Sequence, residues 1–201
     1  MVMKTSIKSL VAAALMTVVV STSTVYAYSP APLKTISASA VDVTAIKKVI
    51  VKGNVEVTLV QAPSSKVLFK NENDAYVQVK QVGNSLFVDT KKSDETAKIT
   101  VYVDEIYRVD ASGNAVVHTK EALKLDYLQV FLKDNAKADI NSTTLGLYTS
   151  LIGASELKLQ GSTNDHVVAM DALSKITMEK FSAVKTEKKS ISMPEYAALN
   201  D

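Results

Sequence analysis

Residues Val109 to Thr119 read VDASGNAVVHT, and this stretch sets the pattern of the second half of the chain. Apolar and polar residues alternate on both sides of a small polar cluster, Ser112-Gly113-Asn114. Alternation is typical of β-strands, and small polar residues are typical of tight corners. Three later segments align on the same pattern: VFLKDNAKADI, TSLIGASELKL and VAMDALSKITM. The sequence therefore predicts a strand–corner–strand unit that is used four times.

The alignment sets Ala115, Ala136, Ser155 and Ser174 above one another at nearly equal intervals along the chain. Positions an even number of residues away are mostly apolar, and because strand side chains alternate, they predict one inner face. These inner positions are Val109, Val130, Thr149 and Val168; Ala111, Leu132, Leu151 and Met170; Val117, Ala138, Leu157 and Ile176; and Thr119, Ile140, Leu159 and Met178.

The outer positions support the same register. We call the four aligned residues the anchors. The residues directly after the last three anchors alternate in charge: Lys137, Glu156 and Lys175. Asp139 is likewise expected beside Lys158. Periods of about twenty residues with this content indicate a solenoid, in which each coil pairs with the next. An antiparallel sandwich with a chance similarity of spacing is the alternative.

Strand-like runs also fill the first half, from Ile46 to Val103. Gly53-Asn54 and Gly83-Asn84 separate alternating β-branched runs, which favours hairpins and antiparallel neighbours here. No stretch shows sustained helical periodicity. The predicted fold is an all-β, right-handed β-helix-like solenoid of short strands, with antiparallel pairing in its N-terminal half.

The N-terminal segment, positions 1–27, has the layout of a cleavable secretory leader. Lys4 and Lys8 precede the apolar run Leu10–Val20, and Val25-Tyr26-Ala27 ends the segment with small residues. The apolar run is too short for a membrane span, which needs ~20 residues. The predicted organisation is a leader (1–27), a Ser-, Ala- and Pro-rich tether (28–45), one β domain (46–193) and a C-terminal tail (194–201). Export to the periplasm or the cell surface follows.

Charge and cysteine content exclude several classes of function. The chain has 23 Lys+Arg and 21 Asp+Glu, and removal of Lys4 and Lys8 with the leader makes the remainder neutral. Arg108 is the only arginine, so the basic, arginine-rich face of a nucleic-acid-binding protein is not expected. The absence of cysteine rules out disulfides and thiolate chemistry.

Few residues suggest catalysis. His166 could act as a base, but it has no evident nucleophile and fits the edge of the core better. His118 falls on the outer face beside Asp139, as a solvated or proton-sensitive pair. Asp104, Glu105 and Asp110 surround Arg108, a grouping that some polysaccharide-cleaving β-helices use, although turn capping explains the first two acids more simply. Five tyrosines could belong to a sugar-binding surface, with the last two in one outer row: Tyr76, Tyr102, Tyr107, Tyr127 and Tyr148.

Four segments resemble the head GIN domain family, described as putative auto-transporter adhesins and exported by bacteria such as Bacteroidetes. They are VKGNVEVTLVQ (Val51–Gln61), NSLFVDT (Asn84–Thr90), KITVYVDEIYRVDASGNA (Lys98–Ala115) and IGAS (Ile152–Ser155). The likeness covers roughly positions 42 to 193 and implies a right-handed, single-stranded β-helix-like fold without an assigned activity. Lys133-Asp134, Ile152-Gly153 and Asp171-Ala172 replace the Ser-Gly corner of the family.

These observations predict an exported, non-enzymatic β-solenoid module that binds a glycan or a protein surface. We assign no catalytic, cofactor-binding or metal-binding residue and expect no nucleic-acid partner. A polysaccharide-active enzyme built on Arg108 and Asp110, and an envelope structural protein, are the alternatives.

Overall fold

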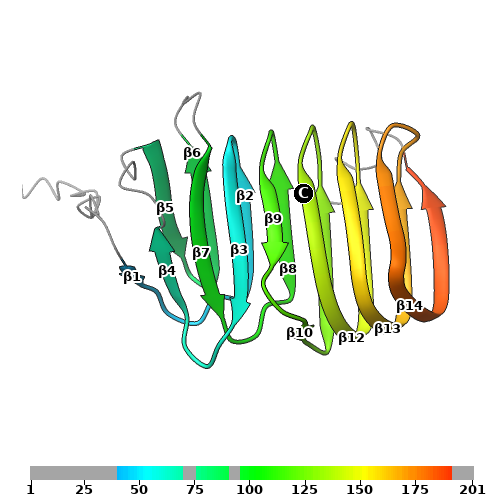
Figure 1. The fold of residues 1–201 in the computed structure, drawn as a ribbon, viewed down its shortest axis with the longest axis horizontal. Coiled ribbons are helices and arrows are strands. Elements are labelled where there is room, and N and C mark those ends of the chain that lie inside the picture. The colour runs from blue at the N-terminus through cyan, green and yellow to red at the C-terminus, as the bar shows by residue number, and fades with distance from the viewer. Residues whose placement is uncertain (1–39, 70–75, 91–95, 192–201) are drawn as a thin grey trace, which may run out of the picture. The chain divides into compact units, whose positions relative to one another are not determined.

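The computed structural model describes residues 40–69, 76–90 and 96–191, and its regular elements there are all strands (Figure 1). They form one 14-stranded sheet with mixed parallel and antiparallel pairing, which confirms the all-β class. The predicted leader and C-terminal tail lie outside the described residues. The strands are β1 (Ala40–Asp42), β2 (Lys48–Lys52), β3 (Val55–Gln61), β4 (Lys66–Phe69), β5 (Val77–Val82), β6 (Ser85–Thr90), β7 (Ala97–Val103), β8 (Arg108–Ser112), β9 (Val116–Thr119), β10 (Leu123–Lys124), β11 (Tyr127–Leu132), β12 (Lys137–Leu151), β13 (Glu156–Met170) and β14 (Lys175–Ser190).

The sheet curls so that its strands lie in two runs, one behind the other in Figure 1. The front run contains β4, β7, β3 and β9, and the rear run contains β5, β6, β2, β8 and β11. β12 joins the runs, because its beginning pairs with β9 and its end pairs with β11. β13 and β14 bend in the same way, so strands of 15 or 16 residues replace the short strands that we expected.

We call each strand–corner–strand segment a rung. The predicted register of the last four rungs is confirmed by parallel pairing of Val116 with Lys137, Lys137 with Glu156, and Glu156 with Lys175. Backbone hydrogen bonds at the corners follow the same order. The amide that follows each anchor residue donates to the carbonyl of the anchor residue in the preceding rung. These bonds are Lys137 N to Ala115 O (2.9 Å), Glu156 N to Ala136 O (3.0 Å) and Lys175 N to Ser155 O (2.9 Å).

The predicted inner face is the core. Val109, Val130 and Thr149 have no exposed surface, and all four anchors are buried. Ile176 and Met178, on the last rung, are half-buried, and of the described strands only β13 pairs with their strand, β14. Burial of such columns is the main driving force for stacking, at about 25 cal/mol per Å² of apolar surface.

The two Gly-Asn turns of the N-terminal half differ. Gly83-Asn84 joins β5 and β6 in an antiparallel hairpin, as predicted. The prediction for Gly53-Asn54 was wrong, because β2 and β3 belong to different runs. Gly53 forms a corner at φ +89°, and its amide donates to Ser112 O of the neighbouring rung (3.2 Å). Contacts with adjacent rungs thus hold this turn open, and local sequence does not decide its geometry.

Rung order departs from chain order in the first half. The β2–β3 rung lies between the β6–β7 rung and the β8–β9 rung, with parallel partners on both sides. The expectation that each coil pairs only with the next was therefore wrong here. Among the described strands, antiparallel pairing occurs only beyond this point, in β1–β4, β4–β7 and β5–β6. β1 falls within the segment that we predicted as a tether.

At the opposite end, β14 pairs with β13 alone among the described strands. Its second half continues the inner columns with polar residues, since Thr186 pairs with His166 and Lys188 pairs with Val168. A charge on the inner side of an edge strand discourages the addition of another strand.

Candidate functional site

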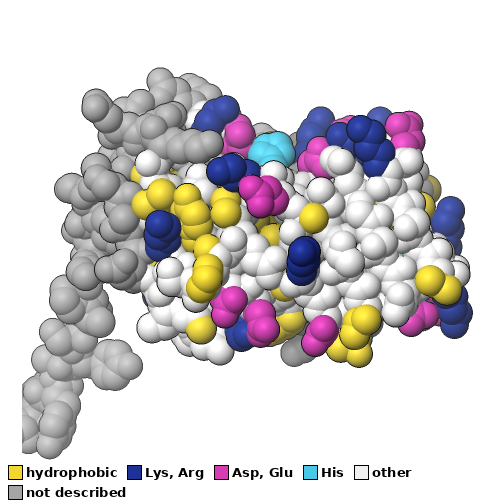
Figure 2. Space-filling view, turned by 60° about the horizontal axis from the view of Figure 1, so that its bottom comes forward, with side chains coloured by type: hydrophobic (Ala, Val, Ile, Leu, Met, Phe, Trp, Pro, Cys, Tyr) yellow, Lys and Arg dark blue, Asp and Glu magenta, His cyan; other side chains and the backbone are white. Residues whose placement is uncertain are grey.

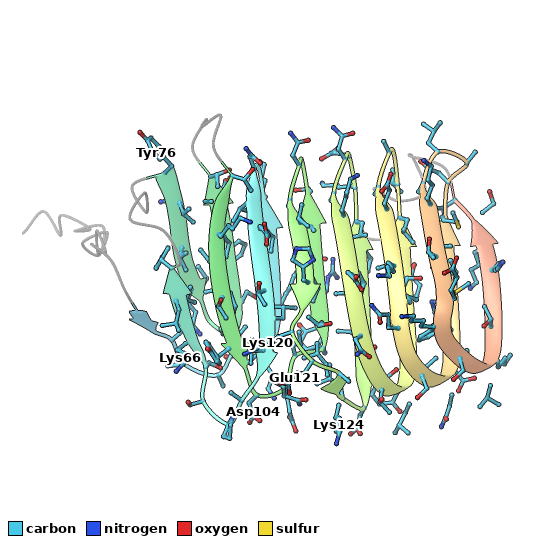
Figure 3. All side chains as sticks on the ribbon, viewed as in Figure 1. Lys66, Tyr76, Asp104, Lys120, Glu121 and Lys124 are labelled. Carbon is cyan, nitrogen blue, oxygen red and sulfur yellow. The ribbon has the colours of Figure 1, made fainter. Side chains whose placement is uncertain are left out.

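The acidic cluster predicted around Arg108 does not converge. On the rear run, Asp110 accepts a hydrogen bond from Arg108 Nε (2.8 Å) and forms an ion pair with Lys48 Nζ (3.0 Å). Glu105 instead pairs with Lys47 (2.9 Å). Asp104 lies at the lower edge of the molecule (Figure 3), and its carbonyl oxygen accepts from Gln61 Nε2 (3.1 Å). The three carboxylates therefore do not share one catalytic centre.

Sequence reasoning missed the surroundings of Arg108. Its guanidinium stacks over the Phe131 ring at 3.9 Å from the centroid, and Phe131 contacts Tyr148 at 5.5 Å. The Phe131 side chain faces outward yet is buried. Lys48 was not foreseen because the non-sequential order of rungs brings β2 beside β8.

His166 lies inside the last rungs and is 1% exposed. Its Nε2 contacts Thr149 Oγ1 at 3.1 Å, and its ring meets Phe181 edge-on at a centroid distance of 5.3 Å. Its Nδ1 has no hydrogen-bond partner among the described residues. Burial lowers its pKa from 6.5 to about 4, since a charged imidazole would lose its hydration there. These contacts fit a neutral core residue, as preferred from the sequence.

His118 lies on the outer face of the front run. Its Nε2 is 3.6 Å from Glu56 Oε1, whereas Asp139 is held by Lys158 (3.0 Å) and Gln160 (2.8 Å). Burial tends to raise the pKa of Asp139, but the hydrogen bonds from Gln160 and Lys158 and nearby positive charge outweigh it and lower the pKa. The expected Asp139–Lys158 pair is confirmed.

The tyrosines do not form the predicted outer row. Tyr127 pairs with Gly146 across β11 and β12, and Tyr148 pairs with Gln129, so the two tyrosines are not equivalent positions of neighbouring strands. The spacing that we used to align them belongs to the front run instead. Lys66 Nζ lies over the Tyr102 ring, 4.4 Å from its centroid, and Tyr76 lies at the upper edge of the molecule (Figure 3).

Among the described residues, a groove with a volume of about 960 Å³ lies along the lower edge. It runs where the connections before β8 and β11 meet the bends of β12, β13 and β14. Figure 2 looks toward this edge and shows hydrophobic side chains separated by charged ones. Four large apolar side chains in its lining are exposed: Tyr107 (50%), Tyr127 (65%), Leu145 (50%) and Val184 (86%).

The ring of Tyr127 lies directly on Gly146. A Cβ atom added to Gly146 would be 2.9 Å from Cδ1 and 3.2 Å from Cε1 of that ring. Glycine therefore allows the ring to rest on the backbone of the bend, with the rest of its surface open to solvent. Because the ring is already held against the bend, a ligand that stacks on it would cost less side-chain entropy than one that had to order a free ring.

Backbone hydrogen bonds fix the floor of the groove. The Asp126 carbonyl accepts from Leu145 N (2.9 Å) and Gly146 N (3.1 Å), while Leu125 N donates to Thr143 O (3.1 Å). Gln61 clamps Lys124 through both its amide atoms, at 2.9 and 3.0 Å. The groove is thus formed before any ligand arrives.

The groove carries polar groups but no evident reactive centre. The side chains of Asp126, Lys124 and Asn164 are exposed and point to no partner within the described chain. Over residues 40–69, 76–90 and 96–191, no group of three or more His, Asp or Glu is placed to hold a metal ion. No helix in these segments is long and apolar enough to cross a membrane.

Together these features define an all-β protein of stacked strands with an aromatic and polar groove along one edge. The chain belongs to the family described as "Putative auto-transporter adhesin, head GIN domain", which matches residues 45–192. This confirms the resemblance inferred from the sequence. An adhesin-like family implies an exported or surface protein. No curated protein matches the chain.

Solved structures share the fold. A putative adhesin from Bacteroides fragilis has a TM-score of 0.65 at 18% identity, over 75% of this chain and 74% of that chain. A putative lipid binding protein from Parabacteroides distasonis gives 0.57 at 13%, over 75% and 76%. A putative adhesin from Parabacteroides merdae gives 0.56 at 17%, over 77% of each. At these identities the likeness concerns the fold alone.

Proposed function

We propose that this protein is an exported, non-enzymatic binding module that attaches to a partner through the lower-edge groove. The observation that carries the proposal is the preformed groove with four exposed apolar side chains, Tyr107, Tyr127, Leu145 and Val184. Isolated exposed apolar residues are ordinary, but several around one concave site mark a binding surface. The adhesin-like family supports the same function.

The dispersal of the acidic residues supports a binding role over an enzymatic one. Asp110 is held by two cations and Glu105 by one, so neither carboxylate is poised as an acid or a base beside the other. A polysaccharide-cleaving site would require such groups to face one bond.

An adhesion assay tests the proposal. Beads coated with the mature chain are applied to surfaces bearing polysaccharides, extracellular-matrix proteins or bacterial envelope fragments. We expect retention on at least one surface, and Leu145→Ser should reduce it. Leu173→Ser is the matched control, because Leu173 is a similarly exposed leucine (73%) on an upper corner. The proposal would be refuted if beads bearing Leu145→Ser and Leu173→Ser were retained equally, or if no surface retained the unaltered chain.

We also infer the handedness of the winding, the segment boundaries and the export of the chain from its sequence pattern. Parallel strands joined by a crossover are right-handed in ~98% of cases, which supports a right-handed β-helix-like winding of the rungs. The boundaries at positions 27, 45 and 193, and delivery to the periplasm or surface, remain part of this proposal. N-terminal sequencing of the exported protein, with Tyr28 expected first, tests the leader.

A further inference from the structure

We propose that the lower-edge groove binds a neutral glycan, with one sugar ring stacked on Tyr127. This inference rests on the proposed binding function and names its ligand class. Its first support is the seating of the Tyr127 ring on Gly146, which leaves the side chain 65% exposed. Sugar rings present patches of C–H groups on their faces, and a tyrosine ring offers an apolar surface with a polar tip for such a patch.

The polar groups around this platform suit hydroxyl groups. Asp126 supplies carboxylate acceptors, Lys124 supplies donors, and the Asn164 amide supplies both. These side chains are exposed and have no partner within the described chain, so a ligand can bond to them without breaking an internal contact. An apolar lipid tail would leave them unpaired, which is costly when they are buried.

The charge of the groove indicates a neutral ligand. Lys47 and Lys124 are matched by Glu105 and Asp126, and Lys47 is already paired with Glu105 at 2.9 Å. An anionic polymer would meet no net positive charge here, and Asp126 would repel it. Recognition of sulfated or uronic-acid chains would call for an excess of basic residues.

The bends of successive rungs extend the site along the stack. Leu145, Asn164 and Val184 occupy equivalent positions on β12, β13 and β14, next to the paired residues Gly146, Asp165 and Lys185. Neighbouring strands are ~5 Å apart, so the groove offers alternating apolar and polar contacts at short, regular intervals. This geometry suits an oligosaccharide better than a single sugar.

The experiment is calorimetric titration of the mature chain with neutral polysaccharides (mannan, laminarin, arabinogalactan) and anionic ones (polygalacturonate, heparin). Binding to at least one neutral polymer, and none to the anionic pair, is expected. Tyr127→Ala should weaken binding about tenfold or more through loss of the stacking surface. Gly146→Ala keeps the ring but removes its seat, and should also weaken binding.

Tyr76→Ala is the matched control, because Tyr76 is similarly exposed (47%) but lies at the upper edge. It should bind as the unaltered chain does. Thermal melts establish that each variant is folded, and Tyr127→Phe, which retains stacking, should bind within a few-fold of the unaltered chain. Binding only to anionic polymers, to no glycan, or equally after Tyr127→Ala would overturn the inference. Groove-dependent bead adhesion without glycan binding would overturn it while leaving the proposed function intact.

Discussion

The carboxylate of Asp171 accepts a 2.8 Å hydrogen bond from the backbone amide of Gly153, one rung earlier in the stack. It also accepts from the amides of Leu173 (3.1 Å) and Ser174 (2.9 Å). Asp134 holds the amide of Gly113 in the same way, at 3.0 Å. At these corners an acidic side chain thus accepts hydrogen bonds from backbone amides of its own corner or of the neighbouring one.

Asp171→Ala should destabilise the protein by about 1–2 kcal/mol, because it leaves backbone donors without their acceptor. Thermal or urea unfolding measures the loss. Glu179→Ala, an exposed residue on the neighbouring β14, is the control and should change stability little. Equal effects of the two substitutions would contradict the role of the corner bonds.

The same carboxylate should also contribute to acid sensitivity. Burial raises the pKa of Asp171, but hydrogen bonds from Gly153, Ser174 and Leu173 outweigh this and lower it below 3.8. A lowered folded pKa means that the stabilisation is present above the unfolded value and is lost as pH falls through the folded value. The advantage of the unaltered chain over Asp171→Ala should therefore shrink below about pH 4.

His166 should make stability depend on pH in a higher range. Its pKa falls from 6.5 to about 4 on folding, so the unfolded chain binds more protons between these values. The contribution of the neutral His166 to the free energy of unfolding is therefore fully present above pH 6.5. It is lost as the pH falls toward 4, by about 3 kcal/mol at most. Urea denaturation of the His166→Leu variant should lack this slope, whereas His118→Ala should retain it. An unchanged slope in His166→Leu would contradict the assignment.

Gly161→Ala should be severely destabilising, by about 4 kcal/mol or more. Gly161 has φ +98°, and a Cβ there would collide with the carbonyl oxygen of Ser142 on the neighbouring rung. Gly83→Ala separates the two effects, because Gly83 also has positive φ (+55°) but nothing lies near its added Cβ. The substitution at Gly83 should cost only about 1 kcal/mol, the strain of placing alanine in a left-handed backbone conformation. Comparable losses in the two variants, measured by thermal unfolding, would exclude the collision.

The Asp139–Lys158 pair should contribute little stability despite its 3.0 Å separation. Both side chains are partly exposed, so solvent screens the attraction to below about 1 kcal/mol. A double-mutant cycle with Asp139→Asn and Lys158→Gln measures the coupling, which should decrease further in high salt. A coupling of several kcal/mol would show that the pair fixes more than the register.

Regular alternation determined the all-β class, the inner columns and the register of the last four rungs. Val130, Ile140 and Leu159 are buried where their parity placed them, because side-chain direction in a strand depends only on position along it. The charge alternation of Lys137, Glu156 and Lys175 predicted the same stacking, since equivalent residues of parallel strands are neighbours. The resemblance to the head GIN domain family was likewise available from the sequence.

Only the tertiary structure decided the order of the first rungs and the place of the groove. The Gly-Asn pair at Gly83 makes a hairpin. The same pair at Gly53 makes an open corner, because a neighbouring rung forms a hydrogen bond with it. Tyr127 and Gly146 meet because β11 pairs with β12 at a shorter register offset than β9 does, and the front-run spacing does not reveal this difference. Pairing between strands that are distant in the sequence fixes both the Gly53 corner and the Tyr127–Gly146 contact. The sequence of a single strand therefore cannot predict them.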